Sequence, residues 1–182
     1  MAGVDTVLGP VDATELGVTL IHEHILVDWI GAEQTSPDRY DADAVVALAL
    51  PYLRDARELG VRTIVDCTPA YLGRDVRVLE RLAEGSGLNV LTNTGYYGAA
   101  DDRFVPRSAY ERPAEALAGD WIRERQEGID GTGIRPAFMK IGVDAGPLST
   151  IDAKLVEAAA MAHEATGMAI HAHTSDAVAG LA

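Results

Sequence analysis

Residues 17–25 read G-V-T-L-I-H-E-H-I and place two histidines at the end of a short apolar run. Side chains two apart on a β-strand point to the same face, so His22 and His24 are expected to project together, with Glu23 turned the other way. Two neutral imidazoles that converge from a strand are a good start on a divalent-metal site. Taken alone, the pair is equally compatible with two polar residues that end a strand.

The rest of the chain alternates short apolar runs with longer amphipathic stretches. The apolar runs predict strands at 18–21, 62–67, 88–92, 137–141 and 168–172. The amphipathic stretches predict helices at 45–59, 73–82, 114–126 and 150–165. Strands separated by helices indicate βαβ units and a parallel sheet. Five such units without a glycine-rich phosphate loop favour a (β/α) barrel over a dinucleotide-binding sheet.

Several residues suggest where these elements begin and end. Asp41 and Asp43 are plausible caps for the first helix, and Gly60 is expected to end it. Pro51 lies inside that helix and is expected to kink or split it. The stretch 96–113 contains two prolines and several charges and is expected to be a loop.

Composition limits the class of protein. The chain has 182 residues, of which 48% are hydrophobic and 24% charged, so a single globular domain is expected over residues 1–182. A net charge of −13 argues against nucleic acid or an anionic membrane as a partner and allows a small-molecule substrate. The single cysteine, Cys67, excludes an intrachain disulfide. Because no signal-like or membrane-spanning run is visible, we expect a cytoplasmic protein.

In a (β/α) barrel the active site lies at the carboxyl ends of the strands. Each predicted strand has, at or near its carboxyl end, at least one polar side chain that could take part in catalysis or binding. They are His22 and His24, then Asp66 and Thr68, then Thr94, Tyr96 and Tyr97, then Lys140, and finally His171, His173 and Thr174.

Lys140 lies in the apolar strand A-F-M-K-I-G. Burying a lysine costs free energy unless the amine is neutralised or paired. One interpretation is a lysine that reaches solvent or pairs with an acid at the mouth of the strand. The other is a desolvated amine with a lowered pKa that can bond covalently to a carbonyl carbon.

Histidines on the last strand and fourth helix are assigned different roles. His173 is expected to be a metal ligand because it lies at the very end of the strand. His171 is expected to be a core histidine bonded to a polar group of a neighbouring strand. His163, on the fourth helix, is expected at the surface.

Aromatic residues follow two of the strands. Tyr96, Tyr97 and Trp29 either pack loop against barrel or line a substrate pocket. Trp121 lies in a helix and is expected to pack in the outer layer. Cys67 is expected to be a small buried residue rather than a nucleophile, because no basic partner is evident nearby.

The chain resembles the phosphotriesterase family of the amidohydrolase superfamily, including its lactonase branch. The matching segments occur in the order of the family and cover nearly the whole chain. They are G-V-T-L-I-H-E-H-I-L-V-D (17–28), T-I-V-D-C-T-P (63–69), L-G-R-D-V (72–76), G-I-D-G-T-G-I-R-P-A-F-M-K-I-G (128–142) and T-G-M-A-I-H-A-H-T (166–174).

The resemblance implies a (β/α)8 TIM barrel, of which this sequence holds about the first five βα units, and a centre of two divalent metal ions. His22 and His24 match the ligands of strand one, and His173 matches the ligand of strand five. Lys140 matches the lysine that, once carboxylated by carbon dioxide, bridges both metals. Zinc is the first choice, with manganese, cobalt and iron as alternatives.

The resemblance also implies the chemistry. A hydroxide held between the metals would attack a lactone or ester carbonyl or a phosphotriester, and one metal would polarise the oxygen of that group. Tyr97 matches a tyrosine that members of the lactonase branch carry beside the metals, whereas phosphotriesterases proper tend to have tryptophan there. Tyr97 is therefore the candidate catalytic residue, and lactone or ester hydrolysis is favoured.

Two alternatives stay open. The family pattern also uses a histidine after strand six and an aspartate after strand eight, which these 182 residues do not include. Five strands cannot close a barrel, and exposed strand edges would promote association, including a homo-oligomer. The chain could therefore be a truncated, non-catalytic fragment that binds at most one metal. It could also be another amidohydrolase of the amidase or deaminase type.

Overall fold

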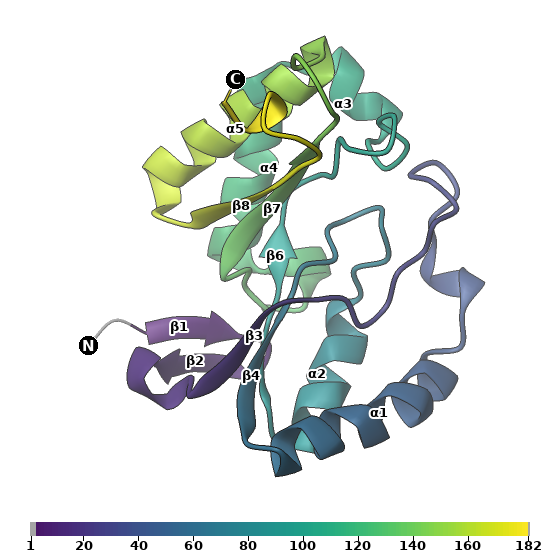
Figure 1. Cartoon of the computed structure of the whole chain (residues 1–182), viewed down its shortest axis with the longest axis vertical. Coiled ribbons are helices and arrows are strands. Elements are labelled where there is room, and N and C mark those ends of the chain that lie inside the picture. Colours follow the sequence, from purple (N-terminus) through teal and green to yellow (C-terminus); the bar gives the residue numbers. More distant parts are fainter. Residues whose placement is uncertain (1–2, 182) are drawn as a thin grey trace.

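Parallel strands and helices alternate along most of the chain in the computed structural model, which describes residues 3–181 (Figure 1). The strands are β1 (Gly3–Thr6), β2 (Gly9–Asp12), β3 (Val18–Glu23), β4 (Val61–Asp66), β5 (Asn89–Leu91), β6 (Asn93–Thr94), β7 (Phe138–Val143) and β8 (Ala169–Thr174). The α-helices are α1 (Ala42–Glu58), α2 (Val76–Ser86), α3 (Arg107–Glu111), α4 (Ala114–Glu127) and α5 (Thr150–Thr166). None of the helices in residues 3–181 is long and apolar enough to span a membrane.

Six of the strands form two parallel sheets of three. One sheet has the order β3-β4-β5 and the other β6-β7-β8. Only Thr92 separates β5 from β6, so the strand predicted at 88–92 is two short strands that each pair with a different sheet. β3 and β8 each pair with a single neighbour, so the barrel is not closed within residues 3–181. The predicted mixed α/β fold with parallel strands is confirmed.

Helices pack on each of the two sheets (Figure 1). α1 and α2 pack on β4 and β5, where Leu53 and Leu82 join Ile64 and Val90 in one buried cluster. α4 and α5 pack on the second sheet, where Trp121, Leu155 and Met139 belong to another cluster. Full burial of an apolar side chain of this size stabilises a fold by roughly 1.5–3 kcal/mol. The helices therefore hold the strands, and with them the residues at the strand ends.

The structure corrects two expectations and adds a hairpin that the sequence patterns did not predict. β1 and β2 form an antiparallel hairpin that alternation did not reveal, with Gly9 at a φ of 107° that glycine accommodates. α3 forms inside the stretch expected to be a loop. α1 continues through Pro51 without a split, since Asp41 caps the helix through two backbone N–H groups and Leu53 anchors it in the core. Cap and packing outweigh the hydrogen bond that proline removes.

Candidate metal centre

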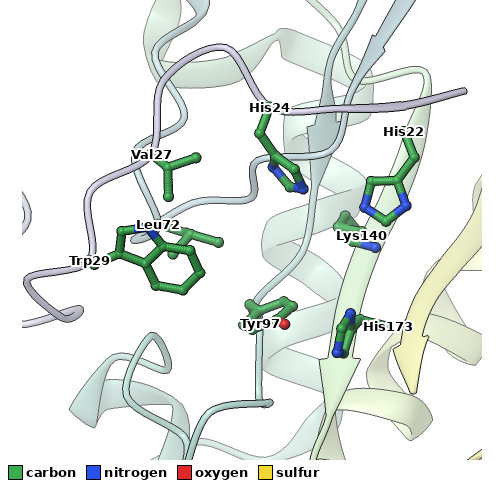
Figure 2. Close-up of a pocket in the computed structure, with 8 residues that line it drawn as sticks. All are labelled: His22, His24, Val27, Trp29, Leu72, Tyr97, Lys140 and His173. Atoms are coloured by element: carbon green, nitrogen blue, oxygen red, sulfur yellow. The ribbon is translucent and has the colours of Figure 1, made fainter. Parts of the chain in front are cut away.

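A pocket of about 420 Å³ opens at the carboxyl ends of the strands (Figure 2). It is lined by His22, His24, Val27, Trp29, Leu72, Tyr97, Lys140 and His173. All five residues predicted to form the site are among them. In Figure 2 the three imidazoles and the Lys140 amine surround one space, and the apolar side chains lie on its other side. The structure therefore brings together side chains from five separate segments.

His22 and His24 lie where β3 ends. The pairing of β3 with β4 is irregular between Leu20 and Glu23, and the Cys67 N–H donates to the Glu23 carbonyl at 2.7 Å. The two imidazole centroids are 5.2 Å apart, and both rings line the pocket. Glu23 does not line it. The prediction that the two histidines project together is confirmed.

His24 is oriented by a buried polar chain. Its Nδ1 is 3.0 Å from the Thr68 hydroxyl, which lies 3.3 Å from Oδ1 of Asp66. With the threonine proton donated to the carboxylate, the threonine oxygen accepts from Nδ1–H, which leaves Nε2 with a free lone pair. Asp66 also accepts the N–H of Ile25 at 3.0 Å, which fixes the backbone beside His24. Asp66 and Thr68 thus support the site from behind.

Burial shapes the charge of these groups. It raises the pKa of the Asp66 carboxyl to about 7, although N–H and hydroxyl donors oppose the rise. Burial also lowers the pKa of His24, with further lowering by His22 and Lys140. Neutral imidazole is the form that binds metals, so the environment favours ligation.

Lys140 is the third residue of β7 and only 3% exposed. No hydrogen bond or ion pair joins its amine to another of residues 3–181, so no acid of the described structure pairs with it. Burial lowers its pKa. The backbone at Gly95, with a φ of 115°, lies against the Lys140 carbonyl. A Cβ at position 95 would clash with that carbonyl oxygen, so only glycine fits there. The burial of Lys140 and its lowered pKa agree with the second interpretation.

β8 presents its two histidines to different surroundings. His173 lines the pocket, with its ring centroid 5.3 Å from that of Tyr97. His171 instead stacks on Phe138 at 4.4 Å, so its predicted polar partner is replaced by an aromatic ring. His163 is exposed, as predicted, and its Nδ1 lies 2.8 Å from the Met168 carbonyl. Burial lowers the pKa of both His171 and His173.

Tyr97 lies across β7 because Gly142 has no side chain. A Cβ at Gly142 would be 2.7 Å from the Tyr97 ring. The Tyr97 hydroxyl points toward His173 (Figure 2). Burial and the charge of Asp144 raise the pKa of Tyr97, so the phenol stays protonated at neutral pH. Trp29, 59% exposed, forms the opposite wall and contacts Phe104 edge-on.

Other predictions about aromatic and sulfur side chains have mixed outcomes. Tyr96 is only 8% exposed and packs on Trp121 at 5.5 Å, so Tyr96 is core and does not line the pocket. Trp121 packs in the helical layer, as predicted. Cys67 is buried and burial raises its pKa to about 11, in line with a non-nucleophilic role. Val27 and Leu72 were missed, because an apolar residue after a strand has no signal of its own.

The donor set suits a transition-metal ion. Three imidazoles around one pocket favour zinc and its neighbours over calcium or magnesium. A protonated amine cannot bind a cation, but Lys140 is buried, unpaired and lowered in pKa. Conversion of that amine to an anionic oxygen ligand would neutralise added cations and remove the cost of a buried ammonium. The residues present therefore fit the metals that the resemblance implies.

Comparison with known proteins gives a family model and relatives whose names agree with one another. The model of the Phosphotriesterase family matches residues 2–182. A phosphotriesterase homology protein of Mycobacterium tuberculosis is 34% identical over 96% of this chain and 55% of its own length. A phosphotriesterase homology protein of Escherichia coli is 33% identical over 91% of this chain and 55% of its own length. An aryldialkylphosphatase of Saccharolobus solfataricus is 33% identical over 91% of this chain and 52% of its own length. An N-acetyltaurine hydrolase of Xenopus tropicalis is 27% identical over 93% and 56%.

These matches agree with the order of the motifs along the sequence. The chain spans about half the length of the curated relatives it matches. A match that runs over residues 2–182 is not confined to one motif or one βα unit. The chain belongs to the Phosphotriesterase family.

Proposed function

We propose that the protein is a metal-dependent hydrolase whose centre is built on His22, His24, His173 and Lys140. The supporting observation is the convergence of three imidazoles and a buried, unpaired lysine in one pocket. Two divalent cations are the proposed cofactors, zinc first and manganese, cobalt or iron as alternatives. Bound there, they would supply Lewis acidity and lower the pKa of water toward neutrality.

Lys140 is the proposed bridging ligand after carboxylation. Its neutral amine attacks carbon dioxide, a nitrogen–carbon bond forms, and one proton leaves to solvent. The product is an anionic carbamate with two oxygen donors. Because burial lowers the pKa of Lys140, the neutral amine needed for this step is more populated than for an exposed lysine.

The walls of the pocket suggest how a substrate is held. Val27, Trp29 and Leu72 offer an apolar surface for an acyl, alkyl or aryl group. Tyr97, protonated because its pKa is raised, can donate a hydrogen bond to an oxygen of the reacting group. A small neutral lactone or ester is the proposed substrate class. The names of the relatives, an aryldialkylphosphatase and an N-acetyltaurine hydrolase, make phosphotriesters and N-acyl amides the alternatives.

Metal removal tests the proposal. The protein is assayed on lactones, aryl esters, phosphotriesters and N-acetylated amines before chelation, after chelation, and after zinc, manganese or cobalt is restored. Turnover should fall at least about 100-fold on chelation, recover with metal, and be highest on lactones or esters. Turnover that survives complete metal removal contradicts the proposal. A metal-loaded protein that turns over none of the four classes supports the non-catalytic alternative.

Thr68→Val tests whether the polar chain behind His24 matters. Valine keeps the shape of the buried threonine but cannot accept from His24 Nδ1. Loss of such outer-shell support lowers metal affinity by roughly 10–100-fold, which competition with a chromophoric chelator measures. Thr92→Val is the matched control, because the Thr92 hydroxyl is equally buried and has no hydrogen-bond partner in the described structure. Equal metal affinity in both variants would refute the role of Thr68.

A further inference from the structure

Three carboxylates meet behind the pocket, outside the set of residues that line it. Asp102 lies in the segment after β6, Asp144 directly follows β7, and Asp152 lies in the first turn of α5. One carboxylate oxygen from each can be chosen so that all three lie within 4.8 Å of one another. None of the three lines the pocket of Figure 2. The cluster is therefore a separate feature of the fold.

Asp152 is the buried member of the cluster. Its side chain is only 1% exposed, and its Oδ1 has no hydrogen-bond partner in the described structure. That oxygen faces Gly98 so closely that a Cβ on Gly98 would clash with it. The Gly98 carbonyl accepts the N–H of Asp102 at 3.1 Å, so Gly98 begins the turn that carries Asp102. Asp152 thus brings an unpartnered, desolvated carboxylate oxygen against the start of the turn that carries Asp102.

The charge of the cluster is not neutralised by protein groups. Within residues 3–181 no ion pair involves any of the three aspartates. Asp144 accepts only the N–H groups of Ala100 and Asp101, and Asp102 Oδ1 is buried without a partner. Burial, and then the charges of Asp152 and Asp144, raise the pKa of Asp102, although a hydrogen bond with the Tyr110 hydroxyl opposes the rise. Like charges this close, with unsatisfied oxygens, are costly unless a counter-charge is present.

The nearest lysine in the sequence of α5 does not serve as that counter-charge. Lys154 donates its three N–H bonds to the carbonyls of Ala109, Tyr110 and Arg112, at 2.8–2.9 Å. An ammonium has three donors, so Lys154 has none left for a carboxylate. Within residues 3–181, no basic side chain therefore pairs with the three aspartates.

We propose that Asp102, Asp144 and Asp152 bind a calcium ion, in a site independent of the histidine–lysine pocket. The donors are all carboxylate oxygens, which hard cations such as calcium prefer. Zinc is favoured by nitrogen and sulfur donors, and this site has neither. Calcium–oxygen distances of about 2.3–2.6 Å place oxygens on opposite sides of the ion about 4.6–5.2 Å apart. Oxygens already within 4.8 Å of one another need little rearrangement. Water would complete the shell.

The proposed ion would join three segments near the substrate pocket. Asp144 extends β7, Asp152 begins α5, and Asp102 belongs to the loop that starts next to Tyr97. Ala100, Asp101 and Asp102 all have φ angles of 56–67°, a run that only strong tertiary contacts maintain. Calcium would hold this turn against β7 and thereby support the position of Tyr97.

Calcium binding is tested on the full chain after treatment with a chelator. Calcium is titrated by calorimetry, and Tm is followed in parallel. One site is expected, and calcium at about a hundred times Kd should raise Tm by about 5–10 °C. Asp152→Asn and Asp102→Asn should each abolish the shift. Asp55→Asn, which neutralises an exposed aspartate of α1, should retain it.

Two further arms make the result decisive. A His22→Ala/His24→Ala variant should keep the calcium shift, which separates the site from the imidazole pocket. If Asp152→Asn does not fold, Asp102→Asn decides, because Asp102 lies on a partly exposed turn. The proposal is overturned if calcium leaves Tm unchanged, if only magnesium raises it, or if the shift survives both aspartate substitutions. The proposal is also overturned if the protein binds no calcium and Asp152→Asn raises its Tm. That result would mean that the carboxyls share a proton instead of binding a cation.

Discussion

Lys140→Ala is expected to abolish hydrolysis and to strip the protein of most of its metal. Lys140 is the only buried lysine of the described structure, and it lies among the three imidazoles of the pocket. Lewis-acid stabilisation is worth several kcal/mol in the transition state, and about 1.4 kcal/mol corresponds to a tenfold change in rate. A fall in kcat/KM of at least about 10³-fold should follow. Kinetics and elemental analysis of the same sample measure it.

Two variants separate loss of chemistry from loss of folding. Lys140→Met keeps the length and buried volume of the side chain, so it should fold like the parent and be equally inactive. Lys154→Met removes a lysine that bonds only to backbone carbonyls, so it should lower stability and leave metal content unchanged. Normal metal content in Lys140→Met would contradict the proposed ligand set.

Carboxylation of Lys140 has its own signature. Metal added to stripped protein in buffer free of carbon dioxide should restore little activity, and bicarbonate should then restore the rest. A short carboxylate such as propionate should partly rescue Lys140→Ala, because it can place an oxygen donor in the space left by the side chain. Reconstitution that is indifferent to carbon dioxide would argue for a lysine that acts as a plain amine.

The metal-free chain is expected to lose stability between about pH 4 and pH 7 through Asp66. This carboxyl is 1% exposed, and burial raises its pKa from 3.8 to about 7. A raised pKa means that the folded state favours the protonated acid, so stability is full below about pH 4 and is lost as pH rises through 7. Each pH unit between the two pKa values corresponds to about 1.4 kcal/mol, so the free energy of unfolding should fall by about 4 kcal/mol in total.

Urea unfolding of the wild type and Asp66→Asn from pH 4 to pH 8, in the presence of a chelator, measures this loss. Other titrating groups are common to both proteins, so they cancel in the difference. The free energy of unfolding of the wild type should fall by about 4 kcal/mol relative to Asp66→Asn over this range. Asp55→Asn, on the exposed face of α1, controls for simple loss of a carboxylate. Parallel curves for the wild type and Asp66→Asn would refute the prediction.

Much of the fold follows from local patterns. The apolar run before His22, the strand around Lys140 and the strand through His173 are found where periodicity predicts them. The strand at 88–92 is the exception, because its pairing changes partner at Thr92. Sheet curvature accumulates over neighbouring strands, so no window of local sequence encodes such a break. The short helix α3 was missed for a related reason, since its Ala109 is buried by contacts distant in sequence.

The candidate site divides in the same way. Its chemically distinctive residues could be named from the sequence because parallel strands bring their carboxyl ends to one face. Tyr96 and Tyr97 could not be told apart, because their environments differ only after folding: one ring packs on Trp121, and the other lies across Gly142. Asp66 and Thr68 stood at a strand end, but only the fold shows that they orient His24.

The sequence by itself determined the parallel α/β class, the family and which histidines and lysine are candidates for the site, because these depend on periodicity and on the order of motifs. Tertiary structure alone decided which neighbours each donor meets. It buried Lys140 without a partner, turned His173 to the pocket and His171 to Phe138, and gathered three aspartates distant in sequence. Desolvation and proximity are properties of space rather than of sequence position, and they control the charge and reactivity of every group in the site.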